Sequence, residues 1–480
     1  MVTNLVWFVS CLIFGLCVHQ YKYRLSYLSH FNSKTAYRNS NLTEYWQSSD
    51  PLGQCKLIHT NVVFRHGTRF PSSKDISNME DLFHKLNNSK KRSNLPNDLL
   101  SWKMPFVRNK DKQLTAVGIQ EMMGLGRRFR ELLFNTLSQH QLQGNIQVFS
   151  TSVSRSRNSG NVFLRMFLNT SKSANDIDKM ITIDDEHLRF FDGCPYYKIK
   201  VEKNKDMKRE YNKFMKGREM RSLVKKVNRY IQLNDNPLTA EDLVVMYSLC
   251  GFEIATNSSS YMKPFQCPVN NGLVRCEHDY HSIQTSPHCS LFDERDFPVL
   301  EYLFDLKHYW TKSYGHSITS MMSCKLMSRI NQQIMEAVQA HKSSSTDIRF
   351  PKGIFWFSHA ETILPLVALL GLFNQTIPMT SESFKNRLEL VDKQKYRFAL
   401  FRTANIVPFA ANFGIHVFYC PHLSNGGSSG YQVRLKINEK TVPWPLTNHL
   451  SHISLEEFET RLLKCGPGSF NFTDQCKLVR

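Results

Sequence analysis

The chain has 480 residues, 41% of them hydrophobic, which suits one large α/β domain with an inserted subdomain, or two domains. This composition excludes a disordered or a fibrous protein. Lys and Arg number 61 against 41 Asp and Glu, and the net charge of +20 favours polyanionic partners. Because no zinc-finger spacing, helix-turn-helix signal or basic-aromatic ribonucleoprotein motif is present, we expect no nucleic-acid partner.

The N-terminus predicts a signal segment over residues 1–19. Leu5 to Val18 form a mainly apolar run that is too short to span a bilayer comfortably. Lys22 and Arg24 follow this run, which disfavours the ordinary orientation for export. A membrane anchor, with membrane association through this segment, therefore stays an alternative to a cleaved signal.

The cysteines indicate an oxidising compartment. Of the 12 cysteines, Cys11 and Cys17 lie in the signal segment; the even number that remains forms no C-x-x-C pair and predicts disulfides. We expect a secreted glycoprotein, or one in the lumen of the secretory pathway. Residence in the endoplasmic reticulum stays open, although Cys476 to Arg480 carry no retention signal. Glycosylation sequons begin at Asn41, Asn87, Asn169, Asn257, Asn374 and Asn471.

The first half of the chain alternates strand and helix signals. Residues 20–54 show no clear hydrophobic period, and we interpret them as a loosely ordered lead-in. Residues 57–64 are rich in β-branched and apolar side chains and predict a buried strand. Thr115 resembles a helix N-cap, and apolar residues then recur at helical spacing as far as Leu133. Residues 146–149 predict a second short strand.

Residues 170–345 are charged, helical in pattern and rich in cysteine, and they predict an inserted, mostly helical cap. Thr239 to Asp242 has the form of a capping box before an apolar run. Residues 301–309 also predict a helix.

A second strand-rich region follows the cap. Residues 353–358 predict a strand, and residues 362–372 predict the helix that follows it. Residues 413–420 and 431–437 are further strand candidates. The repetition of strand, loop and helix at both ends predicts a mixed or mostly parallel sheet covered by helices. We assign residues 55–169 and 346–465 to this α/β core, 170–345 to the cap and 466–480 to a C-terminal tail.

Three predicted strands end in residues that can bind and transfer phosphate. These are Arg65 with His66, then Arg155, then His359 with Glu361. In sheets of this kind ligands bind outside the carboxyl ends of the strands. Arginine meets phosphate oxygens two at a time, and neutral imidazole is a nucleophile near physiological pH. A carboxylic acid can protonate the departing alcohol.

Taken singly, these residues carry little information. An isolated Arg-His pair is usually a surface feature, and a lone histidine at a strand end is more often structural than catalytic. The joint pattern is different, since chance gives it roughly once in several thousand chains of this length. Its five specified positions are Arg65, His66, Gly67, Arg69 and Pro71.

This pattern resembles the signature of the histidine acid phosphatase branch of the histidine phosphatase superfamily. Residues 114–121 with Gly126 and Arg127 are similar to the family helix that follows the signature. Residues 150–159 resemble its second arginine segment, with Arg155 in the phosphate-binding place. The resemblance extends from Cys55 to Pro445.

One departure from the family pattern is informative. Ordinary acid phosphatases carry His-Asp at the distal motif, whereas His359-Ala360-Glu361 resembles the multiple inositol polyphosphate phosphatases. Further segments also resemble this subgroup: residues 301–303, 314–316, 364–366, 408–412 and 438–440.

The resemblance implies a phosphoglycerate-mutase-like, three-layer α/β core with a mixed, mostly parallel sheet and an inserted helical cap. It implies that His66 is the nucleophile and forms a phosphohistidine. It implies that Glu361 protonates the leaving hydroxyl and then helps to activate water. The transferring phosphate would be held by Arg65, Arg69, Arg155 and His359. No cofactor and no metal is implied, because the arginines neutralise charge as a metal ion would.

We therefore expect a phosphomonoesterase that acts on a small phosphorylated molecule, namely inositol polyphosphates including inositol hexakisphosphate, with 2,3-bisphosphoglycerate as a further candidate. The alternatives are a broad-specificity acid phosphatase and, from another class, a catalytically silent secreted protein that binds polyanions. A sugar-phosphate mutase is disfavoured by the export signals and the cap. Basic residues of the cap would favour a ring with several phosphates, although an exposed, solvated lysine is the expectation for any single candidate such as Lys307. Oligomeric state, disulfide pairing, pH optimum and position on the ring cannot be deduced.

Overall fold

The structure, a computed structural model, describes residues 26–39, 52–90, 92–134, 144–233, 235–257, 269–270, 273–274, 286–343, 350–374, 377–392, 400–421, 430–447, 450–466 and 468–478. The predicted signal segment therefore lies outside the described residues. Within these ranges, no helix combines the length and the apolar character that a membrane span requires.

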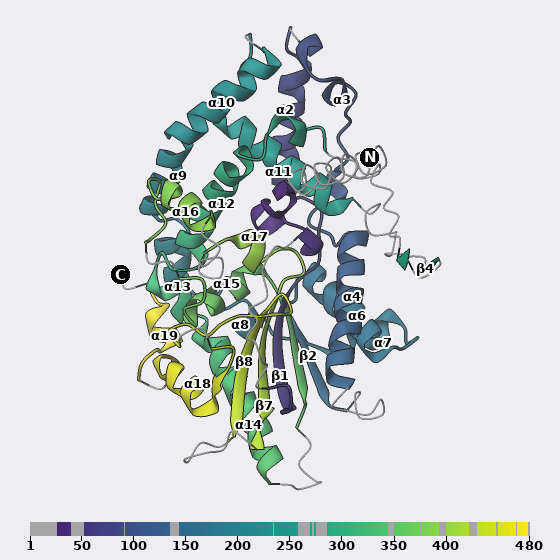
Figure 1. The fold of residues 1–480 in the computed structure, drawn as a ribbon, viewed down its shortest axis with the longest axis vertical. Coiled ribbons are helices and arrows are strands. Elements are labelled where there is room, and N and C mark those ends of the chain that lie inside the picture. Colours follow the sequence, from purple (N-terminus) through teal and green to yellow (C-terminus); the bar gives the residue numbers. More distant parts are fainter. Residues whose placement is uncertain are drawn as a thin grey trace, which may run out of the picture.

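One mixed sheet has the strand order β10-β8-β7-β1-β6-β2-β3 and lies in the lower half of the view in Figure 1, with helices on either side of it. The parallel half consists of β1 (Lys56–Arg65), β6 (Gly353–Ser358), β2 (Ile146–Ser150) and β3 (Ile181–Ile183). The antiparallel half consists of β7 (Asn412–Tyr419), β8 (Tyr431–Ile437), β9 (Lys440–Thr441) and β10 (Ile453–Ser454). All five predicted strands are confirmed.

Helices cover both faces of the sheet and give the expected three layers. Val62 and Phe64 of β1 pack with the helices α4 (Ala116–Phe134) and α6 (Ser154–Leu168). Val63, between them, points to the opposite face and packs in the cluster of α14 (Cys324–Lys342) and α15 (Ala360–Leu369). Because side chains alternate along a strand, a strand buried on both faces is apolar at almost every position.

A group of helices lies beyond the end of the sheet that carries the loops after β1, β2 and β6 (Figure 1). Its longer members are α2 (Ser73–Asn87), α9 (Lys205–Met215), α10 (Arg218–Ile231), α11 (Ala240–Thr256), α12 (Asp296–Lys312) and α16 (Phe384–Asp392). The capping box predicted at Thr239 is present, with Asp242 as its partner. The remaining short elements are α3 (Asn97–Leu100), α7 (Ala174–Asp178), α8 (Asp185–Leu188), α13 (Ser317–Met321), α17 (Thr403–Ile406), α18 (Leu455–Arg461), α19 (Phe472–Gln475), β4 (Val269–Asn270) and β5 (Leu273–Val274).

The division into core and cap stays a prediction. In two places, elements on one side of a predicted boundary pack with elements from the other side. Within the stretch 170–345, β3 pairs with the core strand β2, and α14 packs on the sheet beside β1. Conversely, α2 comes before this stretch in the chain and packs against α11 of the cap. Elements from both sides of the predicted boundaries thus build the space above the strand ends.

The lead-in differs from its expectation. Residues 26–39 form three short 3-10 helices, η1 (Ser26–Ser29), η2 (Asn32–Lys34) and η3 (Tyr37–Asn39). Phe31 and Thr35 are almost fully buried. The expectation of a loosely ordered lead-in is therefore wrong for residues 26–39. Their order depends on polar groups with buried partners, and a hydrophobic period in the sequence does not predict such contacts.

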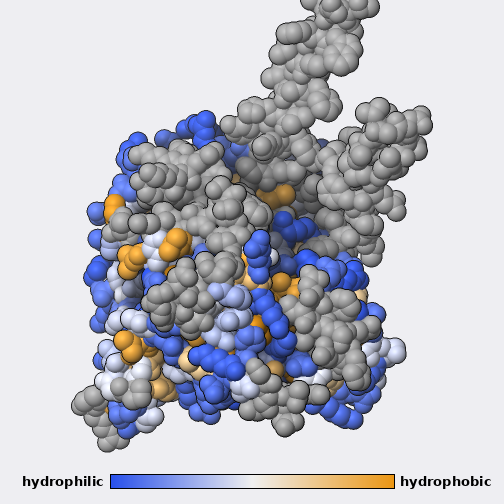
Figure 2. All heavy atoms as spheres, turned by 60° about the horizontal axis from the view of Figure 1, so that its bottom comes forward, coloured by the Kyte–Doolittle hydropathy of each residue, from blue (hydrophilic) through white to orange (hydrophobic). Residues whose placement is uncertain are grey.

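Disulfides join distant parts of the chain, as the cysteine count predicted. The four pairs within the described residues are Cys55–Cys420, Cys194–Cys476, Cys250–Cys289 and Cys324–Cys465. Cys267 and Cys276 lie outside the described residues. On the face shown in Figure 2, hydrophilic residues predominate among the coloured atoms, and hydrophobic residues form separate groups between them.

Candidate active site

The carboxyl ends of three neighbouring parallel strands bring the predicted residues together. Arg65 at the end of β1 pairs in register with Ser358 at the end of β6. The backbone N–H of His66 donates to the Ser358 carbonyl at 3.1 Å, so the loops after both strands leave the sheet side by side. On the other flank of β6, Thr151 follows β2 and donates to the Phe357 carbonyl at 3.1 Å.

His66 is held as a neutral imidazole, and the structure gives its Nε2 no hydrogen-bond partner among the residues it describes. The side chain is 3% exposed, and its Nδ1 lies 2.9 Å from the carbonyl oxygen of Gly67. A carbonyl oxygen only accepts, so Nδ1 carries the proton and Nε2 keeps its lone pair. Burial, reinforced by the charges of Arg65 and Arg155, holds the pKa of His66 well below its ordinary value. The imidazole is therefore unprotonated even in mildly acidic solution.

Arg65 is buried and fixed by main-chain carbonyls. Its Nη1 donates to the carbonyl of Val407 at 2.6 Å and to the carbonyl of Ser33. The guanidinium lies 4.5 Å from the centroid of the Phe409 ring. Burial and the neighbouring Arg69 lower the pKa of Arg65 to about 9. A guanidinium so strongly desolvated beside another cation is stabilised by any anion placed between them.

Arg69 and Arg155 complete the cationic group. Arg69 follows the loop after β1, and its Nη1 donates to the Phe70 carbonyl at 2.7 Å. Arg155, in the first turn of α6, has its pKa lowered to about 10 by burial and by Arg69. The buried Nε of Arg155, like that of Arg65, has no hydrogen-bond partner among the described residues. These unsatisfied donors are available to phosphate oxygens.

His359 caps the start of α15 and faces His66. The two ring centroids are 5.7 Å apart, with an interplanar angle of 64°. Nε2 of His359 lies 3.2 Å from the Thr151 hydroxyl, and Nδ1 lies 3.5 Å from Nη2 of Arg155. Burial lowers the pKa of His359 to about 3, against the opposing charge of Glu361.

Glu361 lies in the first turn of α15 and is paired with a residue that the sequence did not reveal. Nζ of Lys312, the last residue of α12, donates to Oε1 of Glu361 at 2.6 Å. Burial raises the pKa of Glu361, but the charges of Lys312 and His359 outweigh burial and hold it well below the ordinary value. In the ligand-free protein Glu361 is thus a carboxylate.

A close backbone contact between the loop after β1 and helix α4 fixes the loop that carries His66 and Arg69. A Cβ atom at Gly67 would lie 2.5 Å from the carbonyl oxygen of Gly118. The buried Glu121 of α4 accepts from the backbone N–H of Thr68 at 2.8 Å and from its hydroxyl at 3.1 Å. From the other side, the Ser159 hydroxyl accepts from the N–H of Gly67 at 3.1 Å.

A comparison of the whole sequence with models of protein families shows which family the chain belongs to. The model of the histidine phosphatase superfamily (branch 2) matches residues 56–438. The chain belongs to this superfamily. The human multiple inositol polyphosphate phosphatase 1 is 30% identical to it over 474 residues, which cover 94% of this chain and 89% of the human protein. The protein of the same name from Gallus gallus is 31% identical over 433 residues, covering 89% and 85%.

Two solved structures share the fold of this chain. The phytase from D. castellii aligns with a TM-score of 0.66 at 16% identity, covering 94% of this chain and 87% of the phytase. The Bifidobacterium longum multiple inositol polyphosphate phosphatase, solved in complex with inositol hexasulfate, aligns with a TM-score of 0.61 at 15% identity. That alignment covers 94% of this chain and 100% of the bacterial one.

The predicted residues of the histidine phosphatase motif thus converge at one end of the sheet, and Arg65, Arg69, Arg155 and His359 all act on the pKa of His66 or of one another. Sequence reasoning missed Lys312, since a lysine at the end of a helix carries no signal of its own. It also missed Ser33, whose carbonyl binds Arg65. Among the described residues, no group of three or more His, Cys, Asp or Glu side chains is arranged to hold a metal ion.

Proposed function

We propose that this histidine phosphatase hydrolyses phosphate monoesters of inositol polyphosphates through a phosphohistidine at His66. The observation that carries the proposal is a buried, neutral His66 with a free Nε2, surrounded by the cationic side chains predicted to hold phosphate. Inositol phosphates are chosen because the relatives with the highest identities reported above are named for them.

In the first half-reaction Nε2 of His66 attacks phosphorus, the nitrogen–phosphorus bond forms, and the ester bond to the ring oxygen breaks. The arginines neutralise charge on the phosphoryl oxygens as it develops, and the neutral His359 binds one of these oxygens by a hydrogen bond. The departing alkoxide takes a proton from Glu361 and leaves as an alcohol.

In the second half-reaction a water molecule attacks the phosphohistidine. The carboxylate of Glu361 takes a proton from this water, the nitrogen–phosphorus bond breaks, and inorganic phosphate leaves. His66 and the protonated Glu361 are then restored, so the two half-reactions balance.

The pairing of Glu361 with Lys312 bears on the first half-reaction, because a proton donor must be protonated. A phosphate dianion beside Glu361 raises the pKa of its carboxyl group and competes for the Lys312 ammonium. Substrate binding therefore prepares the acid. A substrate with several phosphates carries more negative charge than a single monoester and therefore raises the pKa of Glu361 further.

The four disulfides indicate folding in an oxidising compartment. We place the protein outside the cell or in the lumen of the secretory pathway, with residues 1–19 as the signal segment and glycans at accessible sequons. Membrane attachment through that segment stays the alternative. Core and cap divide as residues 55–169 with 346–465, and 170–345.

The test uses protein from residue 20 onward, produced in a secretory host. We expect phosphate release from inositol hexakisphosphate to exceed that from p-nitrophenyl phosphate, and His66→Ala to lower both rates by about 10³-fold or more. Acid quenching during turnover should trap a phosphorylated protein that the variant does not form. Release from p-nitrophenyl phosphate alone would identify a general acid phosphatase. A folded protein that binds inositol hexakisphosphate without releasing phosphate would overturn the enzyme proposal in favour of a binding protein.

A further inference from the structure

Lys34, at the end of the short helix η2, places its ammonium group over two aromatic rings. Its Nζ lies 4.4 Å from the ring centroid of Phe304 and 5.8 Å from that of Phe252. The guanidinium of Arg69 lies 5.8 Å from the same Phe252 ring. The backbone N–H of Lys34 donates to the Phe31 carbonyl at 2.9 Å, whereas its ammonium group has no hydrogen bond or ion pair with the described residues. A residue of the lead-in thus brings an unpaired cation to the edge of the active site.

The backbone of this segment is firmly positioned. The buried Asn32 donates from Nδ2 to the Tyr247 hydroxyl at 3.3 Å, and the Phe409 N–H donates to the carbonyl of Thr35 at 2.9 Å. Asn32 itself has φ of 46°, a left-handed conformation that asparagine adopts more easily than most residues. One residue before Lys34, the Ser33 carbonyl accepts from Arg65. The position of Lys34 is therefore tied to that of the catalytic loop.

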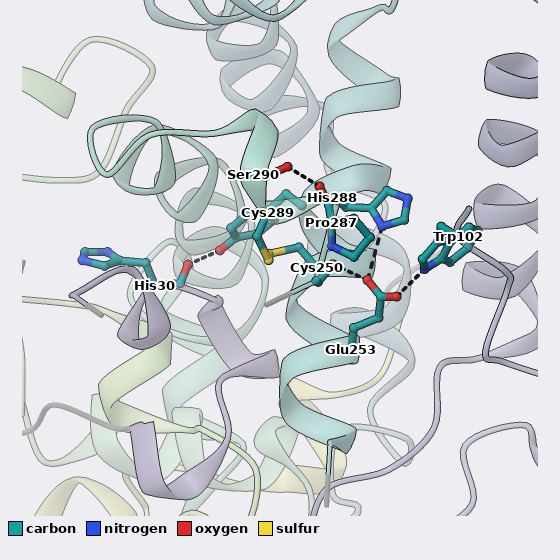
Figure 3. Close-up of a disulfide and its surroundings, with 10 residues drawn as sticks. His30, Trp102, Cys250, Glu253, Pro287, His288, Cys289 and Ser290 are labelled. Carbon is teal, nitrogen blue, oxygen red and sulfur yellow. Dashed lines mark hydrogen bonds and ion pairs between the residues drawn. A yellow bond between two sulfur atoms is a disulfide. The ribbon is translucent and has the colours of Figure 1, made fainter. Parts of the chain in front are cut away.

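The helix that carries the Phe252 ring is also held in place. Phe252 belongs to α11, where Cys250 forms a disulfide with Cys289 (Figure 3). Figure 3 also shows Glu253, which accepts from Nε1 of Trp102 at 2.6 Å and pairs with Nδ1 of His288 at 3.2 Å. These bonds lock the helix on both sides of Phe252, so the ring beneath Lys34 and Arg69 has little freedom to move.

Burial and neighbouring cations together outweigh the one carboxylate that stabilises the Lys34 ammonium. Burial lowers the pKa of Lys34 to about 8; Asp75 opposes this, while Arg69, Lys307 and Arg65 lower it further. The Asp75 carboxylate is already engaged by Ser72 in the capping box of α2. Burying an unpaired ammonium group beside other cations opposes folding, so stability does not explain this placement.

We propose that Lys34 binds a second phosphate of the substrate, one that is not being transferred, and so selects polyphosphorylated molecules over simple monoesters. This inference rests on the proposed function, since it names a further recognition residue of the same site. The charges that act most strongly on Lys34 come from Asp75 of α2, Lys307 of α12 and the signature arginines Arg69 and Arg65. Arg69 shares the Phe252 ring with Lys34, so Lys34 lies beside the group of arginines proposed to hold the transferring phosphate.

Lys307 of α12 extends the same basic surface toward solvent. Its side chain is exposed, and its pKa is lowered by burial of part of the chain and by the charges of Lys312 and Lys74. A ring bearing several phosphates can reach both the partly buried Lys34 and the exposed Lys307, which a small monoester cannot do.

The binding test uses inositol hexasulfate, a probe that no phosphatase step consumes, and His66→Ala protein. We expect Lys34→Met in this background to weaken binding about tenfold or more, as loss of a charge-assisted contact does, and Lys34→Arg to retain most of the affinity. The matched control is Lys342→Met, since Lys342 lies over an aromatic ring too (5.5 Å from Tyr431) but at the far end of α14. Equal affinity of the Lys34→Met and Lys342→Met proteins would overturn the proposal.

Two further measurements separate recognition from structure. The melting temperature of ligand-free Lys34→Met should equal or exceed that of the parent, because the methionine removes a buried, unpaired charge. In the His66-containing protein, the ratio of kcat/KM for inositol hexakisphosphate to that for p-nitrophenyl phosphate should fall about tenfold. A lower melting temperature with an unchanged ratio would show that Lys34 is structural. If the parent protein hydrolyses neither compound, the proposed function fails, while the inositol hexasulfate measurement still decides the role of Lys34.

Discussion

The ion pair between Lys312 and Glu361 sets one residue against its predicted role. The predicted role requires Glu361 to give up a proton, yet the Lys312 ammonium 2.6 Å away favours its carboxylate form. An opposite charge this close lowers a carboxyl pKa by about 1–3 units. The pair also places a cation where the substrate phosphate will lie, so Lys312 attracts substrate and restrains the acid at once.

Lys312→Met should therefore shift the pH dependence of kcat/KM in a defined direction. The protonated form of Glu361 is required, so activity falls as pH rises through its pKa. Removing the ammonium raises that pKa and should move the alkaline limb upward by about one pH unit. Rates are measured across pH with inositol hexakisphosphate, because its alkoxide leaving group needs the proton that Glu361 supplies. Lys312→Arg should restore the parental profile; identical limbs in all three proteins would contradict the coupling.

At the scale of elements, the contact between the loop after β1 and helix α4 decides where His66 and Arg69 lie. Gly67 and Gly118 meet backbone to backbone: a Cβ at Gly118 would be 2.2 Å from the Thr68 carbonyl oxygen and 2.7 Å from its nitrogen. Neither backbone can yield without moving the residues that flank Thr68. The two glycines are needed for this close approach rather than for unusual dihedral angles.

Gly118→Ala should displace the loop and lower kcat/KM about 100-fold, the usual effect of misplacing a reacting group by an ångström. It should also destabilise the protein by about 1–3 kcal/mol through overpacking. Gly124→Ala, six residues along the same helix, is the control. Its Cβ would meet only the flexible end of Arg128 at 3.1 Å, so normal activity and slightly higher stability are expected. The values of kcat/KM and the thermal unfolding of the Gly118→Ala and Gly124→Ala proteins are measured side by side. Equal activities would show that the contact between Gly67 and Gly118 does not position His66 and Arg69.

The elements show how far the sequence predicts this fold. Strands such as residues 57–64 were predictable because both faces are buried, which leaves a continuous apolar run. β3 and β10 escaped prediction, since strands of 3 and 2 residues carry too little pattern. The signature predicted the loop that carries His66, but not its partners. Ser33 contributes a carbonyl and Lys34 an amine, and neither interaction depends on a hydrophobic period.

At the scale of the whole molecule, several buried histidines make stability depend on pH. The pKa of His66, His308 and His416 is held well below the ordinary value, and in each case burial is the main cause. A folded-state pKa below the unfolded value of 6.5 means that the unfolded chain binds protons first as pH falls. The stability contributed by neutral histidine is therefore complete above pH 6.5 and decreases below it. Carboxylates such as Glu301, whose pKa is about 2, lose their contribution only at lower pH.

His59 offers a test of this dependence outside the active site. It is fully buried in β1, with Nδ1 donating to the Pro351 carbonyl at 2.9 Å and Nε2 accepting from Asn61 at 2.8 Å. Both nitrogens are thus committed to the neutral form, and burial lowers the pKa of His59 to about 4. Between pH 6.5 and pH 4, protonation of the unfolded state should remove about 3 kcal/mol of stability on account of this residue alone.

His59→Gln should flatten that decline. The variant loses stability at pH 7, where a buried hydrogen bond is replaced imperfectly at a cost of about 1–3 kcal/mol. As pH falls from 6.5 to 4 it should nevertheless lose about 3 kcal/mol less than the parent, because glutamine does not titrate. Urea unfolding at a series of pH values, with the disulfides intact, measures both curves. The amide oxygen of Asn61 accepts from Nε1 of Trp356 at 2.8 Å, so Asn61 can only donate to His59 and favours its neutral form. Parallel curves would contradict the prediction, because they would mean that the pKa of His59 is the same in the folded and the unfolded protein.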